Sequence, residues 1–155
     1  MNFSLESMLQ LSILLPIFAT VGIVAARNKP NLREAVTIST SLVVFYFVIE
    51  LYHGLSQGEV ISVQWLQLLP GLQLSFTIEP LGMIFALVAS FLWIITTVYS
   101  IGYMRSHHEK NQTRFYACFA IAIGCVMGVA FASNLFTLFI FYEVLTLSTY
   151  PLVTH

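Results

Sequence analysis

Five long apolar stretches alternate with short polar connections along the chain. They cover residues 5–26, 34–52, 80–103, 115–131 and 134–154, and each is close to the roughly 20 residues that cross a hydrocarbon core of about 30 Å. The first stretch is too long for the apolar region of a signal peptide and has no Lys or Arg before it, so it predicts a retained membrane helix. The pattern predicts an all-α integral membrane protein, with five transmembrane helices in one membrane domain over residues 1–155.

The connection between the second and third stretches has a different period. Residues 72–78 alternate apolar and polar side chains, and residues 60–69 are rich in β-branched and bulky ones. Pro70 and Gly71 between them form a turn signal. We therefore expect a small β-hairpin at about residues 60–78, outside the membrane, with its apolar face on the helices or on a neighbouring subunit.

The composition agrees with a membrane protein and its charges predict an orientation. Hydrophobic residues make up 58% of the chain and charged residues 8%, whereas soluble domains have about 25% charged residues. No Lys or Arg occurs in residues 53–79, and Pro30 and its flanking Asn residues predict a helix-breaking loop. The positive-inside rule places the N-terminus outside and the C-terminus inside. All basic residues fall in two connections on that inner side: Arg27, Lys29 and Arg33, then Arg105, Lys110 and Arg114.

Small residues recur every four positions in the fourth stretch. This spacing predicts a stripe on one helix face that lets a neighbouring backbone approach closely. The very short connection after the stripe predicts that the fourth and fifth helices are antiparallel neighbours. The stripe consists of Ala120, Gly124, Gly128 and Ala132.

Several other residues have an ordinary interpretation beside a functional one. Glu50 is expected near the outer interface, and Glu79 before Pro80 is expected to favour a helix N-terminus, with an ion entrance as the alternative. The pair His107-His108 is interpreted as part of a solvated loop, and Cys118 and Cys125 as buried thiols that cannot form a disulfide with each other. No phosphate loop, dinucleotide fingerprint, metal-ligand cluster or activated nucleophile occurs, so we expect no cofactor, bound metal or nucleic acid.

Glu143 is the strongest candidate for a functional residue. It lies near the middle of the fifth apolar stretch, which contains no Lys or Arg. A charge at the centre of a bilayer costs about 2.5–3.5 kcal/mol on insertion scales, so such residues mark ion pathways or proton relays by default. The alternative is a static hydrogen bond or salt bridge to another helix.

The surroundings of Glu143 suit a group that gains and loses a proton. Helical spacing places Thr146 and Tyr150 on its face, among apolar residues that would disfavour the charged carboxylate. Pro151 further along would kink or open the helix and leave a carbonyl for water or hydroxyls. The sequence thus predicts Glu143 as a proton-transfer residue, with Thr146, Tyr150 and Pro151 in support.

Three segments resemble a known superfamily. Residues 133–155, with Phe-Tyr-Glu followed by Ser-Thr-Tyr-Pro-Leu-Val, resemble the fifth helix of the antiporter-like subunits of respiratory complex I, membrane-bound hydrogenases and Mrp-type Na⁺/H⁺ antiporters, most of all the D-type branch of the Mrp subunits. Ile-Glu-Pro-Leu-Gly at 78–82 and Ser-Ile-Gly-Tyr-Met at 100–104 are similar to that superfamily too. The resemblance implies that Glu143 pairs with a lysine on a later helix to modulate proton transfer, and that no redox cofactor binds here.

The resemblance implies a component of a multisubunit monovalent cation/proton antiporter. Its partners would be other membrane subunits, the lipid bilayer and the transported Na⁺ and H⁺, and its location the plasma membrane of a prokaryote. A proton-translocating, non-redox subunit of an NADH–quinone oxidoreductase or a membrane hydrogenase is the alternative. Members of the family have about fourteen helices, so the chain is similar to their N-terminal third. A fragment with only an assembly role is therefore a second alternative.

Overall fold

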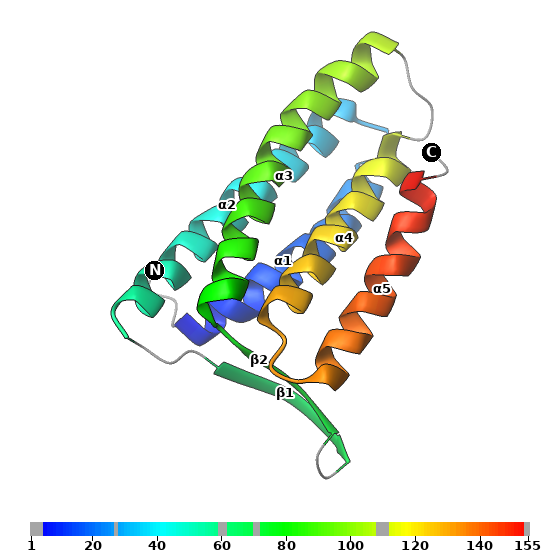
Figure 1. The fold of residues 1–155 in the computed structure, drawn as a ribbon. Coiled ribbons are helices and arrows are strands. Elements are labelled where there is room, and N and C mark those ends of the chain that lie inside the picture. The colour runs from blue at the N-terminus through cyan, green and yellow to red at the C-terminus, as the bar shows by residue number, and fades with distance from the viewer. Residues whose placement is uncertain (1–4, 27, 59–61, 70–71, 108–111, 154–155) are drawn as a thin grey trace.

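The computed structural model describes residues 5–26, 28–58, 62–69, 72–107 and 112–153. They form five helices and one β-hairpin (Figure 1), and four helices, α1 to α4, are long and apolar enough to cross a membrane. The fifth helix, α5, has 19 residues. These findings confirm the predicted helical membrane fold with a small hairpin. The elements are α1 (Leu5–Ala25), α2 (Pro30–Ser56), β1 (Ser62–Leu69), β2 (Leu72–Thr77), α3 (Pro80–His107), α4 (Gln112–Phe131) and α5 (Leu135–Val153).

Three helices extend beyond the apolar stretches that predicted them. The helix expected at 34–52 covers 30–56, the one at 80–103 continues to 107, and the one at 115–131 begins at 112. Hydropathy detects only the part of a helix that lies in hydrocarbon, whereas polar turns continue the helix beyond it. Pro30 begins α2 and does not break it, because the first helical residue needs no N–H donor. The prediction of a loop through Arg33 was therefore wrong.

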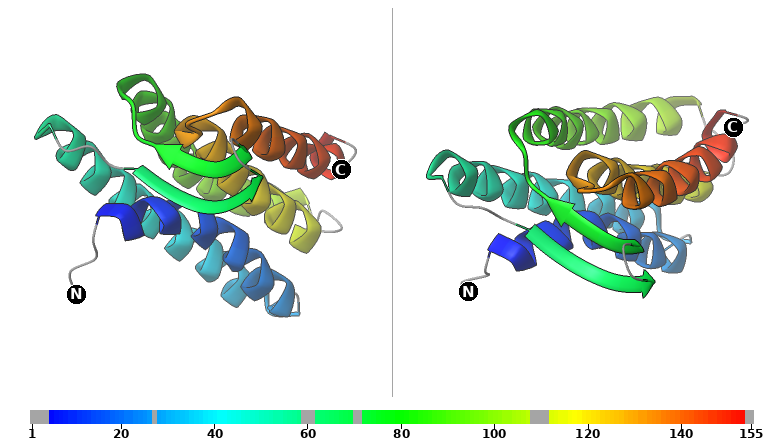
Figure 2. Two further views of the ribbon diagram at one scale, coloured as in Figure 1. Left: turned by 90° about the horizontal axis from the view of Figure 1, so that it is seen from below. Right: turned by 60° about the horizontal axis from the view of Figure 1, so that its bottom comes forward.

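The hairpin crosses one end of the helix bundle (Figure 2). β1 and β2 pair antiparallel, with Val63 opposite Phe76 and two irregularities in register. The predicted turn at Pro70 and Gly71 lies outside the described residues. β2 packs against α4 and α5, and β1 packs against α1. The predicted apolar contact of the hairpin is thus made with the helices of the same chain.

The ends of the helices alternate between the two ends of the bundle. In Figure 1 the starts of α1, α3 and α5 lie at the hairpin end, whereas α2 and α4 start at the opposite end. The helix ends that flank the two basic connections therefore lie at the end of the bundle away from the hairpin. We call this opposite end the basic end.

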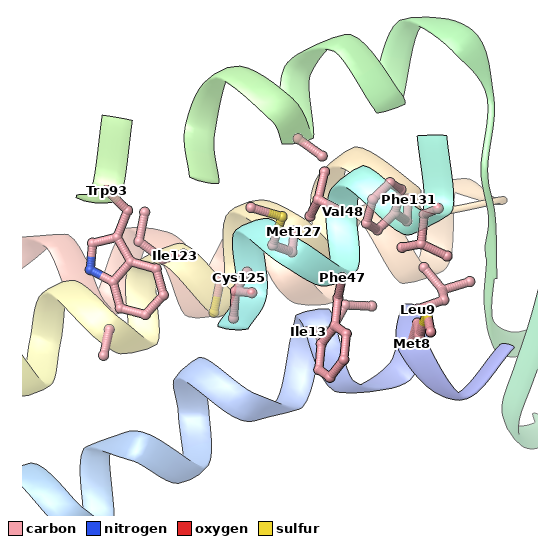
Figure 3. Packing of buried hydrophobic residues seen from close by; sticks show 14 of the residues in the cluster. Met8, Leu9, Ile13, Phe47, Val48, Trp93, Ile123, Cys125, Met127 and Phe131 are labelled. Carbon is pink, nitrogen blue, oxygen red and sulfur yellow. The ribbon is translucent and has the colours of Figure 1, made fainter. Parts of the chain in front are cut away.

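Helix α4 is the centre of the core. It packs against α1, α3 and α5, and four of its apolar side chains, Ile123, Cys125, Met127 and Phe131, are buried against residues of the other helices (Figure 3). In the same view α1 contributes Met8, Leu9 and Ile13, α2 contributes Phe47 and Val48, and α3 contributes Trp93. These side chains face inward. The outer faces of α1, α2 and α3 also present apolar residues, as expected for lipid contact.

Candidate functional site

Helix α5 has an inner face that fixes its position on the bundle. Its first turn is capped by Asn134, whose Oδ1 accepts a hydrogen bond from the N–H of Thr137 at 2.8 Å. Thr137, Phe141 and Ser148 are buried along this face. The ring of Phe141 lies edge-on to the ring of Phe76 in the hairpin, with centroids 5.5 Å apart. The orientation of α5 is therefore set by contacts with α4 and with β2.

Glu143 lies on the opposite, outer face of α5 and is exposed. Its neighbours on this face are large and apolar or aromatic, and the side chains of Leu147 and Tyr150 are 72% and 71% exposed. Within the described part of the chain, Glu143 makes no ion pair. The structure thus places a carboxylate among apolar side chains on a helix face that no described residue covers.

The residues predicted to support Glu143 lie on the same helix. Thr146 is exposed, and its Oγ1 donates a hydrogen bond to the carbonyl oxygen of Tyr142 at 3.0 Å. Tyr150 is exposed on the outer face two turns after Glu143. α5 continues through Pro151 to Val153, and the side chain of Pro151 lies outside the described residues. Glu143, Thr146 and Tyr150 therefore line one exposed strip.

The small residues of α4 face three different elements. A Cβ on Gly124 would lie 2.9 Å from the carbonyl oxygen of Ile13 in α1, and a Cβ on Gly128 would collide with the ring of Phe141 in α5. Ala132 forms an isolated β-bridge with Phe76, and Ala120 is fully buried. Small residues four positions apart on α4 thus face α1, then α5 and then the hairpin, and not a single neighbouring helix.

The structure also buries two charged residues, Arg33, which the sequence pattern placed in a loop, and Glu34, which it placed at the start of the second stretch. Both lie near the start of α2 and are each only 4% exposed. Arg33 Nη1 donates a hydrogen bond to Oγ1 of Thr113 at 3.0 Å, and Nη2 lies 3.8 Å from Glu34 Oε1. The guanidinium lies 5.2 Å from the ring centroid of Tyr116. Adjacent opposite charges at the start of an apolar run were the available signal for this buried cluster.

The remaining candidates take ordinary positions. Glu50 is partly buried near the end of α2, and Glu79 is exposed just before α3. Cys118 and Cys125 are free thiols in α4. The side chains of His107 and His108 lie outside the described residues. Among the residues that the structure describes, no group of three potential metal ligands occurs.

Comparisons with known proteins extend this picture. The family model described as the N-terminus of chain 5 of NADH–ubiquinone oxidoreductase (complex I) matches residues 65–116. The A1 subunit of the Na⁺/H⁺ antiporter of Staphylococcus aureus is 24% identical over 152 residues, which cover 96% of this chain and 19% of that protein. The same protein from strain JH9 is 23% identical over the same coverage. The chain thus spans about a fifth of the length of these curated relatives.

A solved structure shares the fold. It is a chain of the membrane-bound sulfane sulfur reductase, an archaeal respiratory membrane complex, and it matches with a TM-score of 0.76 at 20% identity, over 93% of this chain and 22% of that one. The curated relatives are named as A1 subunits, whereas the motif around Glu143 resembles the D type. The chain is therefore similar to a subunit of a Na⁺/H⁺ antiporter over nearly its whole length, and to the N-terminus of chain 5 of complex I over residues 65–116.

Proposed function

We propose that this chain is part of a multisubunit monovalent cation/proton antiporter that exchanges Na⁺ for H⁺, with Glu143 as a proton-loading residue. The observation that carries the proposal is the position of Glu143 on an exposed, mostly apolar face of α5. An ionised carboxylate against lipid would cost about 2.5–3.5 kcal/mol. That face is therefore expected to be covered by other parts of the assembled transporter.

The partner of Glu143 is expected to be cationic. None of the described Lys or Arg residues forms an ion pair with Glu143, so the cation is expected on a membrane helix outside the described residues. A lysine fits best, because its ammonium group can release its proton when buried, whereas a guanidinium retains its proton. Pairing would hold Glu143 in its charged form, and separation from the lysine would favour proton uptake.

The hydroxyl groups and the proline of α5 would supply the rest of the relay. Thr146 donates its own hydrogen to a backbone carbonyl, so its lone pairs remain able to accept one from water or from a protonated carboxyl group. Pro151 has no N–H, so the carbonyl of Leu147 lacks its usual helical donor and can bind water. Tyr150 could donate its phenolic hydrogen on the same side of the helix.

The decisive variant is Glu143→Gln, which keeps the shape of the side chain and removes the proton site. In everted vesicles that carry the whole complex, this variant should abolish Na⁺ uptake driven by a pH gradient while the complex still assembles. Glu79→Gln, which neutralises an exposed carboxylate at the hairpin end, is the matched control and should retain exchange. Unchanged exchange in Glu143→Gln would contradict the proposal.

A second candidate is a proton-translocating subunit of a respiratory complex. It is favoured by the family model for chain 5 of complex I and by the fold shared with a respiratory membrane complex. Glu143 would then move protons in response to redox chemistry in other subunits. Purification of the complex through a tag on this chain separates the two candidates, because flavin or iron–sulfur partners indicate the respiratory complex and small hydrophobic partners alone indicate the antiporter.

The multi-pass chain is expected to lie in the plasma membrane of a prokaryote, with the hairpin outside and the basic end in the cytoplasm.

If the chain serves only in assembly, Glu143 would be a packing partner and not a transport residue. Reconstituted by itself, the chain should show no antiport, because one glutamate without its cationic partner cannot complete a relay. Robust exchange by the isolated chain would contradict this expectation.

A further inference from the structure

Residues of α2, α3 and α4 line a narrow crevice. In Figure 1, α2 and α3 lie on the side of α4 away from α5. Among the residues that line it are Thr37 of α2, Thr97 and Ser100 of α3, and Tyr116 of α4, and Trp93 of α3 also borders it. The hydroxyl side chains of Thr37, Thr97 and Ser100 are buried, and that of Thr96, which also lines the crevice, is partly buried. Buried hydroxyl groups between membrane helices serve helix packing and interhelical hydrogen bonds, and each can also accept one proton while it donates another.

Arg33 borders the crevice at the basic end. Its guanidinium lies over the ring of Tyr116, which lines the crevice, and its Nη1 is held by Oγ1 of Thr113 at the start of α4. Thr37, one turn after Arg33, donates a hydrogen bond to the carbonyl oxygen of Arg33 at 3.0 Å. The guanidinium thus joins α2 to α4 where the row of hydroxyl groups begins.

The Arg33 cluster closes the crevice by packing and not by net charge. A guanidinium keeps its proton under all physiological conditions, and Glu34, 3.8 Å away, offsets its positive charge, so the buried pair is close to neutral. The crevice beyond it has no room for a water molecule in this conformation. The path is therefore closed in the structure.

We propose that this crevice is an access path for protons from the basic end, and that Arg33 is the residue that holds it shut. The path opens when the guanidinium leaves Thr113 and Tyr116, which admits water between α2 and α3. A proton then moves from the basic end along water and the hydroxyl groups of Thr37, Ser100 and Thr97, each of which accepts one proton and donates another, so the side chains end unchanged. The proposal rests on the transport function above but on different residues.

Thiol labelling tests the path without any transport measurement. The complex is prepared in vesicles with Cys118→Ala and Cys125→Ala, and Ser100→Cys is exposed to a membrane-impermeant thiol reagent from the basic end. Labelling should be several-fold faster when Arg33→Gln or Thr113→Val is added. Ser90→Cys is the matched control, because Ser90 is fully buried in the same helix outside the crevice, and it should stay unlabelled. A Ser100→Cys that is labelled in none of these backgrounds would overturn the proposal.

The rate of exchange tests the proposed path independently if the Arg33 variants fail to assemble. Thr97→Val with Ser100→Ala removes two hydroxyl groups with little change in volume, and should slow exchange several-fold in a complex of normal abundance. Thr40→Val is the control, because Thr40 lies in α2 outside the crevice. A wild-type rate in the double variant would overturn the proposal whatever the labelling result. If Glu143→Gln retains exchange, only the proposed function fails, because the labelling needs no exchange.

Discussion

The backbone N–H of Ser75 in β2 donates a hydrogen bond to Oγ1 of Thr137 in the first turn of α5, with an N–O distance of 3.0 Å. Ser75 also accepts two hydrogen bonds. Its carbonyl oxygen accepts one from the N–H of Ser133 at 3.1 Å, and its Oγ accepts one from Nδ2 of Asn134 at 3.2 Å. The hydroxyl groups of Ser75 and Ser133 are also in hydrogen-bond contact. The hairpin is thus fastened to the α4–α5 turn and to the helix that carries Glu143.

Thr137→Val should destabilise the protein by about 1–3 kcal/mol, because it leaves the buried N–H of Ser75 without its acceptor. Thr137 is fully buried, and the substitution keeps the volume of its side chain nearly unchanged. The apparent melting temperature of the purified protein in detergent measures the loss. Thr146→Val, on the exposed face of α5, should change the melting temperature much less. Equal effects of the two substitutions would show that the bond to Ser75 contributes no stability.

Gly82→Ala should reduce stability strongly for a change of a single methyl group. A Cβ at Gly82 would collide with the backbone carbonyl oxygen of Ala130, which can move only with α4 itself. Overpacking of this kind typically costs about 1–3 kcal/mol. Gly102 has open space around its Cβ position, so Gly102→Ala should be neutral or slightly stabilising because alanine favours the helix. A melting temperature of Gly82→Ala equal to that of Gly102→Ala would contradict the close approach of α3 and α4.

Arg33→Met and Glu34→Gln should each reduce stability, the first more strongly. Removal of one partner of a buried ion pair costs about 3–5 kcal/mol, since the other charge remains buried. The double variant should lose less than the sum of the two single changes, because it leaves no uncompensated charge. Arg33→Lys should be nearly as unstable as Arg33→Met, because an ammonium group lacks the planar fork that contacts Thr113, Tyr116 and Glu34 together. Additive losses in thermal unfolding would mean that the two side chains do not interact.

Phe141→Ala, on the inner face of α5, and Tyr142→Ala, on its outer face, should have different effects on the melting temperature. Phe141 fills the space beside Gly128 and contacts Phe76, so its truncation should cost about 3–5 kcal/mol. Tyr142 is 57% exposed, so its truncation should leave the melting temperature nearly unchanged. If the outer face binds other subunits, Tyr142→Ala should instead reduce recovery of the complex in pull-down experiments. The opposite ranking of melting temperatures would mean that α5 is rotated from its position in the structure.

Much of the fold could be predicted because its signals are local. Runs of about 20 apolar residues indicated the helices, and the alternation at 72–78 indicated the second strand. The burial of Arg33 could not be predicted in this way, because hydropathy assigns a charged residue to a loop regardless of its partners. The partners of Arg33 are Thr113 and Tyr116, which are far away in sequence.

The candidate site shows the same division. Helical spacing could place Glu143, Thr146 and Tyr150 on one face, because these residues belong to one short helix. Which face of α5 turns inward depends on the contact of Phe141 with Gly128 and with the hairpin. No periodicity within α5 encodes those contacts, so the exposure of Glu143 became visible only in the folded chain.

The fastening of Ser75 also sets an order of events during synthesis. Thr137 follows Ser75 by 62 residues, so the ribosome has already produced α3 and α4 before this acceptor exists. Because domains form as the chain emerges, the hairpin must wait beside the membrane with part of its backbone unpaired until α5 has been made. Insertion of α5 would then complete the docking of the hairpin, and a pause in translation between α4 and α5 would prolong the period in which the hairpin is exposed to misfolding and proteolysis.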